Sequence, residues 1–246
     1  MFENEISKYM KKHGLEAFTP KAVLFDMDGV LYDSMPNHAR SWHSSMAGFG
    51  IDMAPEEAYK YEGMRGVETI KLLAKRQWGR DLSDDEAAAM YEKKAEAFRA
   101  CPKAEKMEGV EVLMRKIKAD GLKIVVVTGS GQKSLLHRLE EEFAGLVRGD
   151  LIVTSFDVMH GKPDPEPYLR GLEKAGITPG EGIVVENAPL GVRAGVAAGI
   201  FTIGVNTGPL PDKALIDEGA NLVFPRMTAL RDAWEALFSA TRNSAM

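Results

Sequence analysis

Short apolar runs that alternate with helix-like segments are the feature that most constrains how this chain can fold. There are four clear runs, at residues 22–25, 123–127, 182–185 and 200–205, and two weaker ones, at 151–154 and 222–224. Continuous runs of this kind are typical of strands that are buried on both faces, as in a parallel sheet covered by helices. We therefore expect a parallel sheet at the centre of the molecule.

Helical periodicity fills most of the sequence between these runs. Apolar residues recur at helical spacing in five stretches, which cover residues 109–119, 135–143, 165–175, 190–198 and 229–238. Strands that alternate with helices indicate a doubly wound α/β fold, with a Rossmann-like core built on a parallel sheet.

One long stretch interrupts the alternation. Between the first and second clear runs there is no convincing strand, only amphipathic helical patterns at residues 37–47, 55–61, 67–78 and 83–98. About 65 residues is too long for an ordinary crossover. We expect an all-helical cap domain, residues 36–102, inserted into a core made of residues 1–35 and 103–246. Pro36 and Pro102 mark its two joints, which could act as a hinge that closes loops over a ligand.

Polar side chains follow the expected strands, at the edge of a parallel sheet where ligands bind. These residues are Asp26 and Asp28 after the first run, Thr128 after the second, Lys162 beyond the run at 151–154, and Glu186 and Asn187 after the run at 182–185. Two acids, a hydroxyl, a lysine, an acid and an amide at one edge predict a site for a hard cation and a phosphate group.

Each residue type has a chemical role in such a site. Asp26 could attack phosphorus and form an aspartyl-phosphate, and Asp28 could protonate the leaving group and later activate water. Thr128 and Lys162 could hold phosphate oxygens, and the charge of Lys162 lessens the repulsion between nucleophile and phosphate. The oxygens at positions 26, 28, 186 and 187 suit Mg²⁺.

Two other functions fit the sequence less well. The segment "VVVTGSGQKS" follows a strand and opens a helix, but a dinucleotide fingerprint needs glycine where Ser134 stands. A phosphate-binding P-loop fails because Gln132 separates Gly131 from Lys133. A binding module without catalytic activity is disfavoured by the intact Asp26 and Asp28.

The four ordered motifs resemble those of the haloacid dehalogenase superfamily. They are "DMDGVLYDS", the threonine after "KIVVV", the lysine in "GKPDPEPY" and the acid in "VVENAPLGV". The likeness spans nearly the whole chain. His38 and Trp42 in "NHARSWHSSM" resemble, more specifically, the β-phosphoglucomutase-like subgroup. The likeness implies a Mg²⁺-dependent enzyme with a small phosphorylated substrate, and adds Gly129, Ser130 and His38 as substrate-binding residues.

Departures from the subgroup's pattern bear on the substrate. Asn187 stands where an aspartate is common, and in the cap loop "YEGMRG" Glu62 replaces a phosphate-gripping lysine. This combination resembles a branch that hydrolyses inorganic pyrophosphate, in which Tyr91 and Lys94 would face the substrate. We therefore expect a hydrolase acting on pyrophosphate. The alternatives are a β-phosphoglucomutase, which converts β-glucose 1-phosphate to glucose 6-phosphate, and a broad sugar-phosphate or phosphoglycolate-type phosphatase.

Composition limits the partners and the location. The net charge of −5 argues against nucleic acid and anionic membrane surfaces, and no apolar run is long enough to span a bilayer. A single cysteine, Cys101, suits a reducing compartment. The first 18 residues do not have the pattern of a signal peptide and are expected to form a short surface helix. We expect a cytoplasmic monomer.

Overall fold

The computed structural model describes residues 2–130 and 133–243 and is built on a six-stranded parallel sheet. The strands are β1 (Ala22–Phe25), β2 (Lys123–Val127), β3 (Ile152–Val153), β4 (Gly182–Glu186), β5 (Phe201–Val205) and β6 (Leu222–Phe224). Their order is β3-β2-β1-β4-β5-β6, and every pairing is parallel. The expected α/β fold class is thereby confirmed. The weak run at 151–154 yields only two strand residues, because Gly149–Leu151 forms a 3₁₀ turn, η1.

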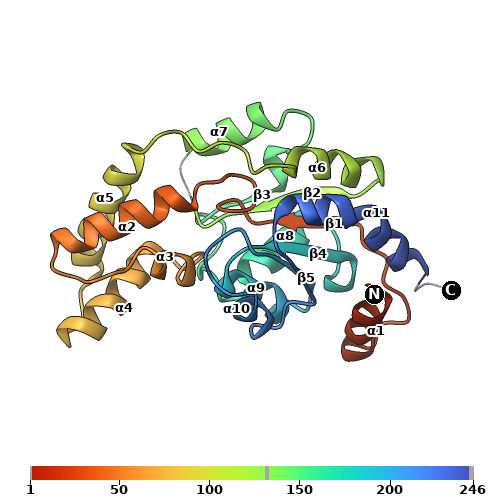
Figure 1. Cartoon of the computed structure of the whole chain (residues 1–246), viewed down its shortest axis with the longest axis horizontal. Helices are drawn as coiled ribbons and strands as arrows, with labels where there is room; N and C mark the ends of the chain where they lie inside the picture. Colours follow the sequence, from red (N-terminus) through yellow and green to blue (C-terminus); the bar gives the residue numbers. More distant parts are fainter. Residues whose placement is uncertain (1, 131–132, 244–246) are drawn as a thin grey trace.

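Helices cover both faces of this sheet (Figure 1). One face packs against α6 (Val110–Ala119), α7 (Lys133–Glu142) and α11 (Met227–Asn243), and the other against α8 (Glu166–Ala175) and α9 (Pro189–Ala197). The short elements η2 (Pro179–Glu181) and α10 (Lys213–Ile216) complete the core.

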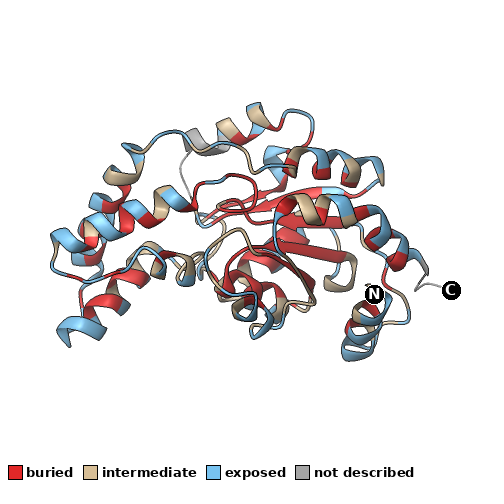
Figure 2. Cartoon of the chain, viewed as in Figure 1, coloured by how far each residue is buried: buried red, intermediate tan, exposed pale blue. Residues whose placement is uncertain are grey.

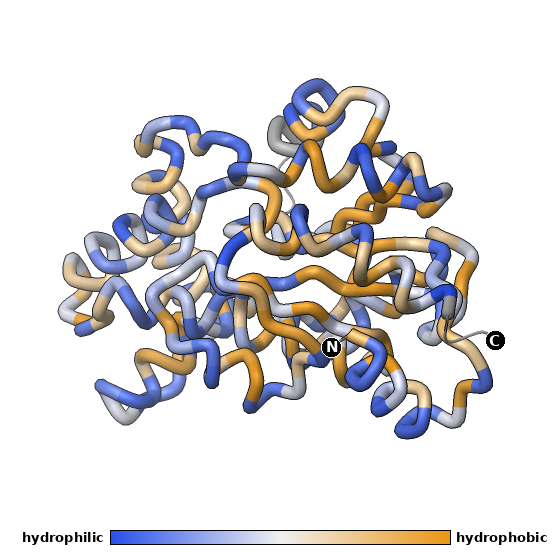
Figure 3. Tube along the Cα trace, turned by 45° about the vertical axis from the view of Figure 1, so that its right-hand side comes forward, coloured by the Kyte–Doolittle hydropathy of each residue, from blue (hydrophilic) through white to orange (hydrophobic). Residues whose placement is uncertain are grey.

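The alternating directions of strand side chains explain why the runs are continuously apolar. In β1, Val23 and Phe25 enter one hydrophobic cluster while Ala22 and Leu24 enter the other. All four are buried, and the strands form the buried, apolar centre of the molecule (Figures 2 and 3). A sheet buried on both sides leaves polar residues only at strand ends, and this places the candidate site.

The N-terminal helix α1 (Phe2–His13) is more deeply packed than the sequence suggested. Ile6 and Tyr9 are buried in the core, and the Tyr9 hydroxyl donates a hydrogen bond to the carbonyl oxygen of Gly199 at 2.9 Å. The expected surface helix therefore exists, but its inner face is part of the hydrophobic core.

Four helices between β1 and α6 form the expected helical block (Figure 1). They are α2 (Met35–Gly48), α3 (Glu57–Lys60), α4 (Gly66–Trp78) and α5 (Asp84–Arg99). Their apolar faces make a hydrophobic cluster separate from those of the sheet. A capping box between Ser83 and Glu86 fixes the start of α5. The boundaries proposed for this cap domain stay a prediction.

Two further expectations concern membrane-spanning helices and the loop that follows β2. None of the helices in residues 2–130 and 133–243 is both long and apolar enough to cross a membrane. Gly131 and Gln132, which entered the comparison with nucleotide-binding loops, lie outside the described residues.

Candidate active site

A buried ion-pair network lies at the carboxyl end of β1. The backbone of Asp26 still belongs to the sheet, since its N–H donates to the carbonyl oxygen of Val185 at 3.0 Å. The ammonium group of Lys162 lies 2.5 Å from Oδ1 of Asp26 and 2.7 Å from Oε1 of Glu186. The side chain of Lys162 is only 2% exposed. Strand geometry thus brings together three of the residues that the sequence singled out.

Burial controls the ionisation of Asp26. Its pKa is raised to about 7, with removal from water as the main cause; Lys162 lowers the pKa, and the carboxylates of Glu186 and Asp28 add to the rise. Burial also opposes the charge on Lys162, but Asp26 and Glu186 outweigh this and hold its pKa well above the usual value. Asp26 therefore needs additional positive charge nearby to be fully ionised at neutral pH.

Glu186 makes four hydrogen bonds that occupy both of its carboxylate oxygens. Oε1 accepts from Lys162 and from the Tyr168 hydroxyl at 2.8 Å, and Oε2 accepts from the backbone N–H groups of Asn187 at 2.9 Å and Ala188 at 3.2 Å. Glu186 thus orients the lysine, and its expected role as a metal ligand stays a prediction. Sequence analysis missed the role of Tyr168, whose one signal is its place among the apolar residues of α8.

Two buried oxygens in the site fit a hard cation. Among the described residues, Oδ2 of Asp26 and Oδ1 of Asn187 are buried and have no hydrogen-bond partner, a costly state unless something else binds them. No cluster of three or more acidic, histidine or cysteine side chains that could hold a metal is found in the described part of the chain. Mg²⁺ does not require one, because it typically takes one or two carboxylates and fills its remaining positions with water and substrate oxygens. Asp26 and Asn187, with Asp28 nearby, therefore suit Mg²⁺.

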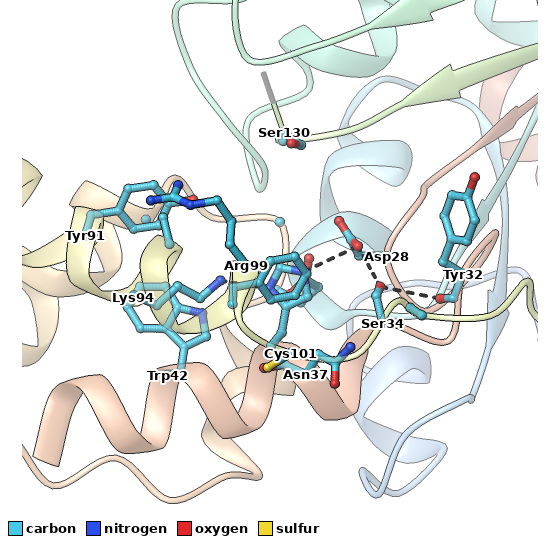
Figure 4. A pocket seen from close by; sticks show the side chains of 18 of the residues that line it. Asp28, Tyr32, Ser34, Asn37, Trp42, Tyr91, Lys94, Arg99, Cys101 and Ser130 are labelled. Carbon is cyan, nitrogen blue, oxygen red and sulfur yellow. Dashed lines mark hydrogen bonds and ion pairs between the residues drawn. The ribbon is translucent and has the colours of Figure 1, made fainter. Parts of the chain in front are cut away.

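Asp28 is held by residues of the adjoining loop and the first cap helix. Its Oδ1 accepts a hydrogen bond from the Ser34 hydroxyl at 2.6 Å and lies 3.4 Å from Nε2 of His38 (Figure 4). Burial would raise the pKa of Asp28, but His38 and Ser34 outweigh burial and lower it. Asp28 is therefore ionised at neutral pH. Sequence reasoning quoted Ser34 within the first motif but gave it no role.

Lys94 continues this chain of contacts into the cap. Its ammonium group lies 2.9 Å from Nδ1 of His38, so the arrangement suits the histidine tautomer with its hydrogen on Nε2, toward Asp28. Lys94 also lies within 5.1 Å of the ring centres of Trp42 and Phe98. Burial lowers the pKa of Lys94 to about 8.

A cavity of about 460 Å³ separates the cap from the core. Its lining includes the predicted residues Asp28, His38, Glu62, Tyr91, Lys94, Gly129 and Ser130. Thr128 is buried beside it, where its hydroxyl oxygen accepts from the backbone N–H of Ser130 at 3.0 Å and so shapes the loop. Asp26, Lys162, Glu186 and Asn187 do not line the cavity and are buried at the strand ends.

Glu62 reaches the site from the loop between α3 and α4. Burial raises its pKa well above the usual value, and the carboxylates of Asp28 and Asp26 raise it further, whereas Lys94 and Lys162 act in the opposite direction. This acid therefore stands in the field of the two aspartates. Glu62 lines the same cavity as Asp28.

Comparison with known proteins agrees with this architecture. The family model described as haloacid dehalogenase-like hydrolase matches residues 23–205, which span β1 to β5. The chain belongs to this family. The resemblance drawn from the four motifs is confirmed, and so is the enzyme class, a haloacid dehalogenase-type phosphohydrolase or phosphotransferase.

Relatives of this haloacid dehalogenase-like hydrolase carry the names of enzymes that act on phosphate esters. It is 33% identical to "Hexitol phosphatase A" of Escherichia coli over 76% of this chain and 83% of that one. It is 30% identical to "Phosphorylated carbohydrates phosphatase" of Thermotoga maritima over 81% and 92%. The solved structure of a "Putative beta-phosphoglucomutase" from Bacteroides vulgatus is 53% identical, with a TM-score of 0.95 over 98% of both chains.

Proposed function

We propose that this haloacid dehalogenase-like enzyme is a Mg²⁺-dependent phosphohydrolase that works through an aspartyl-phosphate at Asp26, with inorganic pyrophosphate as its substrate. The observation that carries the proposal is the position of Glu62. A cap that grips the second phosphate of a sugar bisphosphate needs a cation there, but this cap presents a carboxylate in the field of Asp26 and Asp28.

The first step is transfer of a phosphoryl group to the protein. The carboxylate of Asp26 attacks phosphorus, an oxygen–phosphorus bond forms, and the bond to the leaving phosphate breaks. Lys162, paired with Asp26, offsets the negative charge that gathers there. When bound by Asp26, Asp28 and Asn187, Mg²⁺ would supply further positive charge to the same oxygens.

The second step returns the phosphoryl group to water. Asp28 accepts a proton from water while the water oxygen attacks phosphorus, and the Asp26 carboxylate is released together with inorganic phosphate. The lowered pKa of Asp28 suits this base role. It also suits a phosphate leaving group, which needs less protonation on departure than a sugar alkoxide does. This second point supports pyrophosphate over a sugar ester.

A second candidate is a sugar-phosphate phosphatase. Two relatives carry names that refer to hexitol and carbohydrate phosphates, and a cavity of about 460 Å³ has room for a six-carbon phosphate. β-Phosphoglucomutase, the name given to the structural relative from Bacteroides vulgatus, and a phosphoglycolate-type phosphatase complete the alternatives.

The test is a phosphate-release assay with and without Mg²⁺. The substrates are pyrophosphate, a hexitol phosphate, phosphoglycolate and β-glucose 1-phosphate, the last also in a coupled assay for glucose 6-phosphate. We expect the highest kcat/KM for pyrophosphate, and a loss of at least tenfold in Glu62→Ala. Glu96→Ala, which changes an exposed acid of the same cap that pairs with Lys93, serves as the control. Conversion of β-glucose 1-phosphate without phosphate release would overturn the proposal.

A further inference from the structure

The cap loop that carries Glu62 rests directly on a second loop of the core. An Nη1 hydrogen of Arg65 is donated to the carbonyl oxygen of Met159 at 3.3 Å, across the boundary between cap and core. Met159 belongs to the loop that joins β3 to α8 and lies three residues before Lys162 in that loop. This hydrogen bond therefore joins the cap to the loop that carries Lys162.

The core side of this contact is held in place by Glu166, at the start of α8. One carboxylate oxygen of Glu166 accepts from the backbone N–H of Met159 and the other from that of His160, both at 2.8 Å. The peptide groups around Met159 are therefore fixed, although its side chain is exposed. The carbonyl that Arg65 binds is a prepared acceptor rather than part of a loose loop.

Glycines allow the two loops to approach closely. A Cβ atom at Gly161 would lie 2.8 Å from Cγ of Arg65 and 3.5 Å from the carbonyl oxygen of Gly63. A Cβ atom at Gly129 would lie 3.9 Å from the same carbonyl oxygen. Gly63 itself, at φ +86°, passes over the stem of Lys162, where a Cβ atom would lie 2.9 Å from Cδ. At Gly161 and Gly63, a residue with a side chain would clash with the facing loop.

We propose that Arg65 and Gly161 form a latch that holds the cap loop on the core and so positions Glu62 over the two aspartates. Glu62 lies three residues before Arg65 and directly before Gly63, whose backbone passes over the stem of Lys162. In this proposal Arg65 is a positioning residue that acts through the core loop. The proposal applies to any substrate of the site and does not depend on pyrophosphate.

The test uses graded changes on each side of the latch in the full-length enzyme with Mg²⁺. The variants are Gly161→Ala, Gly161→Val, Arg65→Ala and Arg65→Lys, assayed for kcat and KM with both pyrophosphate and a hexitol phosphate. Because the Arg65 hydrogen bond is exposed to solvent, we expect Arg65→Ala to lower kcat by about three- to tenfold. Arg65→Lys should recover part of this loss, and Gly161→Val should lose more than Gly161→Ala. The preference between the two substrates should not change.

Two controls separate positioning from a general loss of structure. Gly48→Ala adds a Cβ atom in the cap where nothing lies within 4 Å, and Arg80→Ala removes a cap arginine that pairs with Glu86 inside the cap. Both should keep wild-type kcat. Hydrogen exchange of residues 61–65 should become faster in the latch variants, with Tm unchanged. Wild-type kcat in Gly161→Val, or no difference between Arg65→Lys and Arg65→Ala, would overturn the latch.

Discussion

Replacement of Lys162 by methionine tests the buried network at the strand ends. Methionine keeps much of the apolar stem but removes the ammonium group that lies 2.5 Å from Asp26 and 2.7 Å from Glu186. Two buried carboxylates then lose their shared partner. Removing one member of a buried ion pair costs about 3–5 kcal/mol of the free energy of unfolding, because a charge is left without compensation.

Urea denaturation measures this loss. With a slope of about 2–3 kcal/mol per molar urea, a destabilisation of about 3–5 kcal/mol lowers the midpoint by about 1–2.5 M. Glu186→Gln in the Lys162→Met background removes one uncompensated charge while leaving an oxygen for the Tyr168 hydroxyl. It should therefore recover at least about 1 kcal/mol of stability. It should not recover activity, since Asp26 still lacks its partner.

The pH dependence of the Lys162→Met variant gives the sign of the effect. Without the ammonium group, the pKa of Asp26 in the folded state lies further above its unfolded value, which is about 4. Ionisation then favours the unfolded chain, so the destabilisation is largest at pH 8 and shrinks as the pH falls toward 5. A midpoint equal to that of the wild type at pH 7, or a loss that stays constant between pH 8 and pH 5, would refute the electrostatic account of this network.

Three further predictions concern single features. Since the pKa of Asp26 is about 7, kcat/KM should rise from pH 5 to pH 8. A higher Mg²⁺ concentration should move this rise to lower pH. A pH profile that does not change with Mg²⁺ concentration would contradict this prediction. Ser34→Ala should raise the Asp28 pKa and lower kcat about threefold to tenfold, measured as a pH–rate profile, with unaltered kinetics counting against the contact. Tyr9→Phe should cost about 1 kcal/mol in urea denaturation without changing kcat, and equal stability would contradict the packing of α1.

Residues at strand ends were predictable because the rule that places them is geometric. Asp26, Lys162 and Glu186 follow different strands of one parallel sheet, and the pairing of β1 with β4 brings the first and third together without reference to side-chain detail. The cap helices were predictable for a similar reason, since their periodicity runs over many turns. Local pattern and sheet topology suffice for both.

Side-chain partners that depend on packing between distant elements were not predictable. Tyr168 reaches Glu186 only because α8 lies against the sheet at one angle, and in the sequence it is one more apolar residue of a helix. Tyr9 bonds to Gly199, which lies 190 residues away. The sequence assigns no role to Arg65, whose partner is a carbonyl in a loop of the core.

The central claim is that Asp26 receives a phosphoryl group from pyrophosphate. It is tested most directly by mixing the Mg²⁺-loaded enzyme with ³²P-labelled pyrophosphate, quenching in acid within one turnover and mapping tryptic peptides. Cleavage after Lys21 and Arg40 releases residues 22–40 as one peptide. We predict label in this peptide, assigned by fragmentation to Asp26 and lost in Asp26→Asn. Phosphate release without label on Asp26, or label on another residue, would contradict the account.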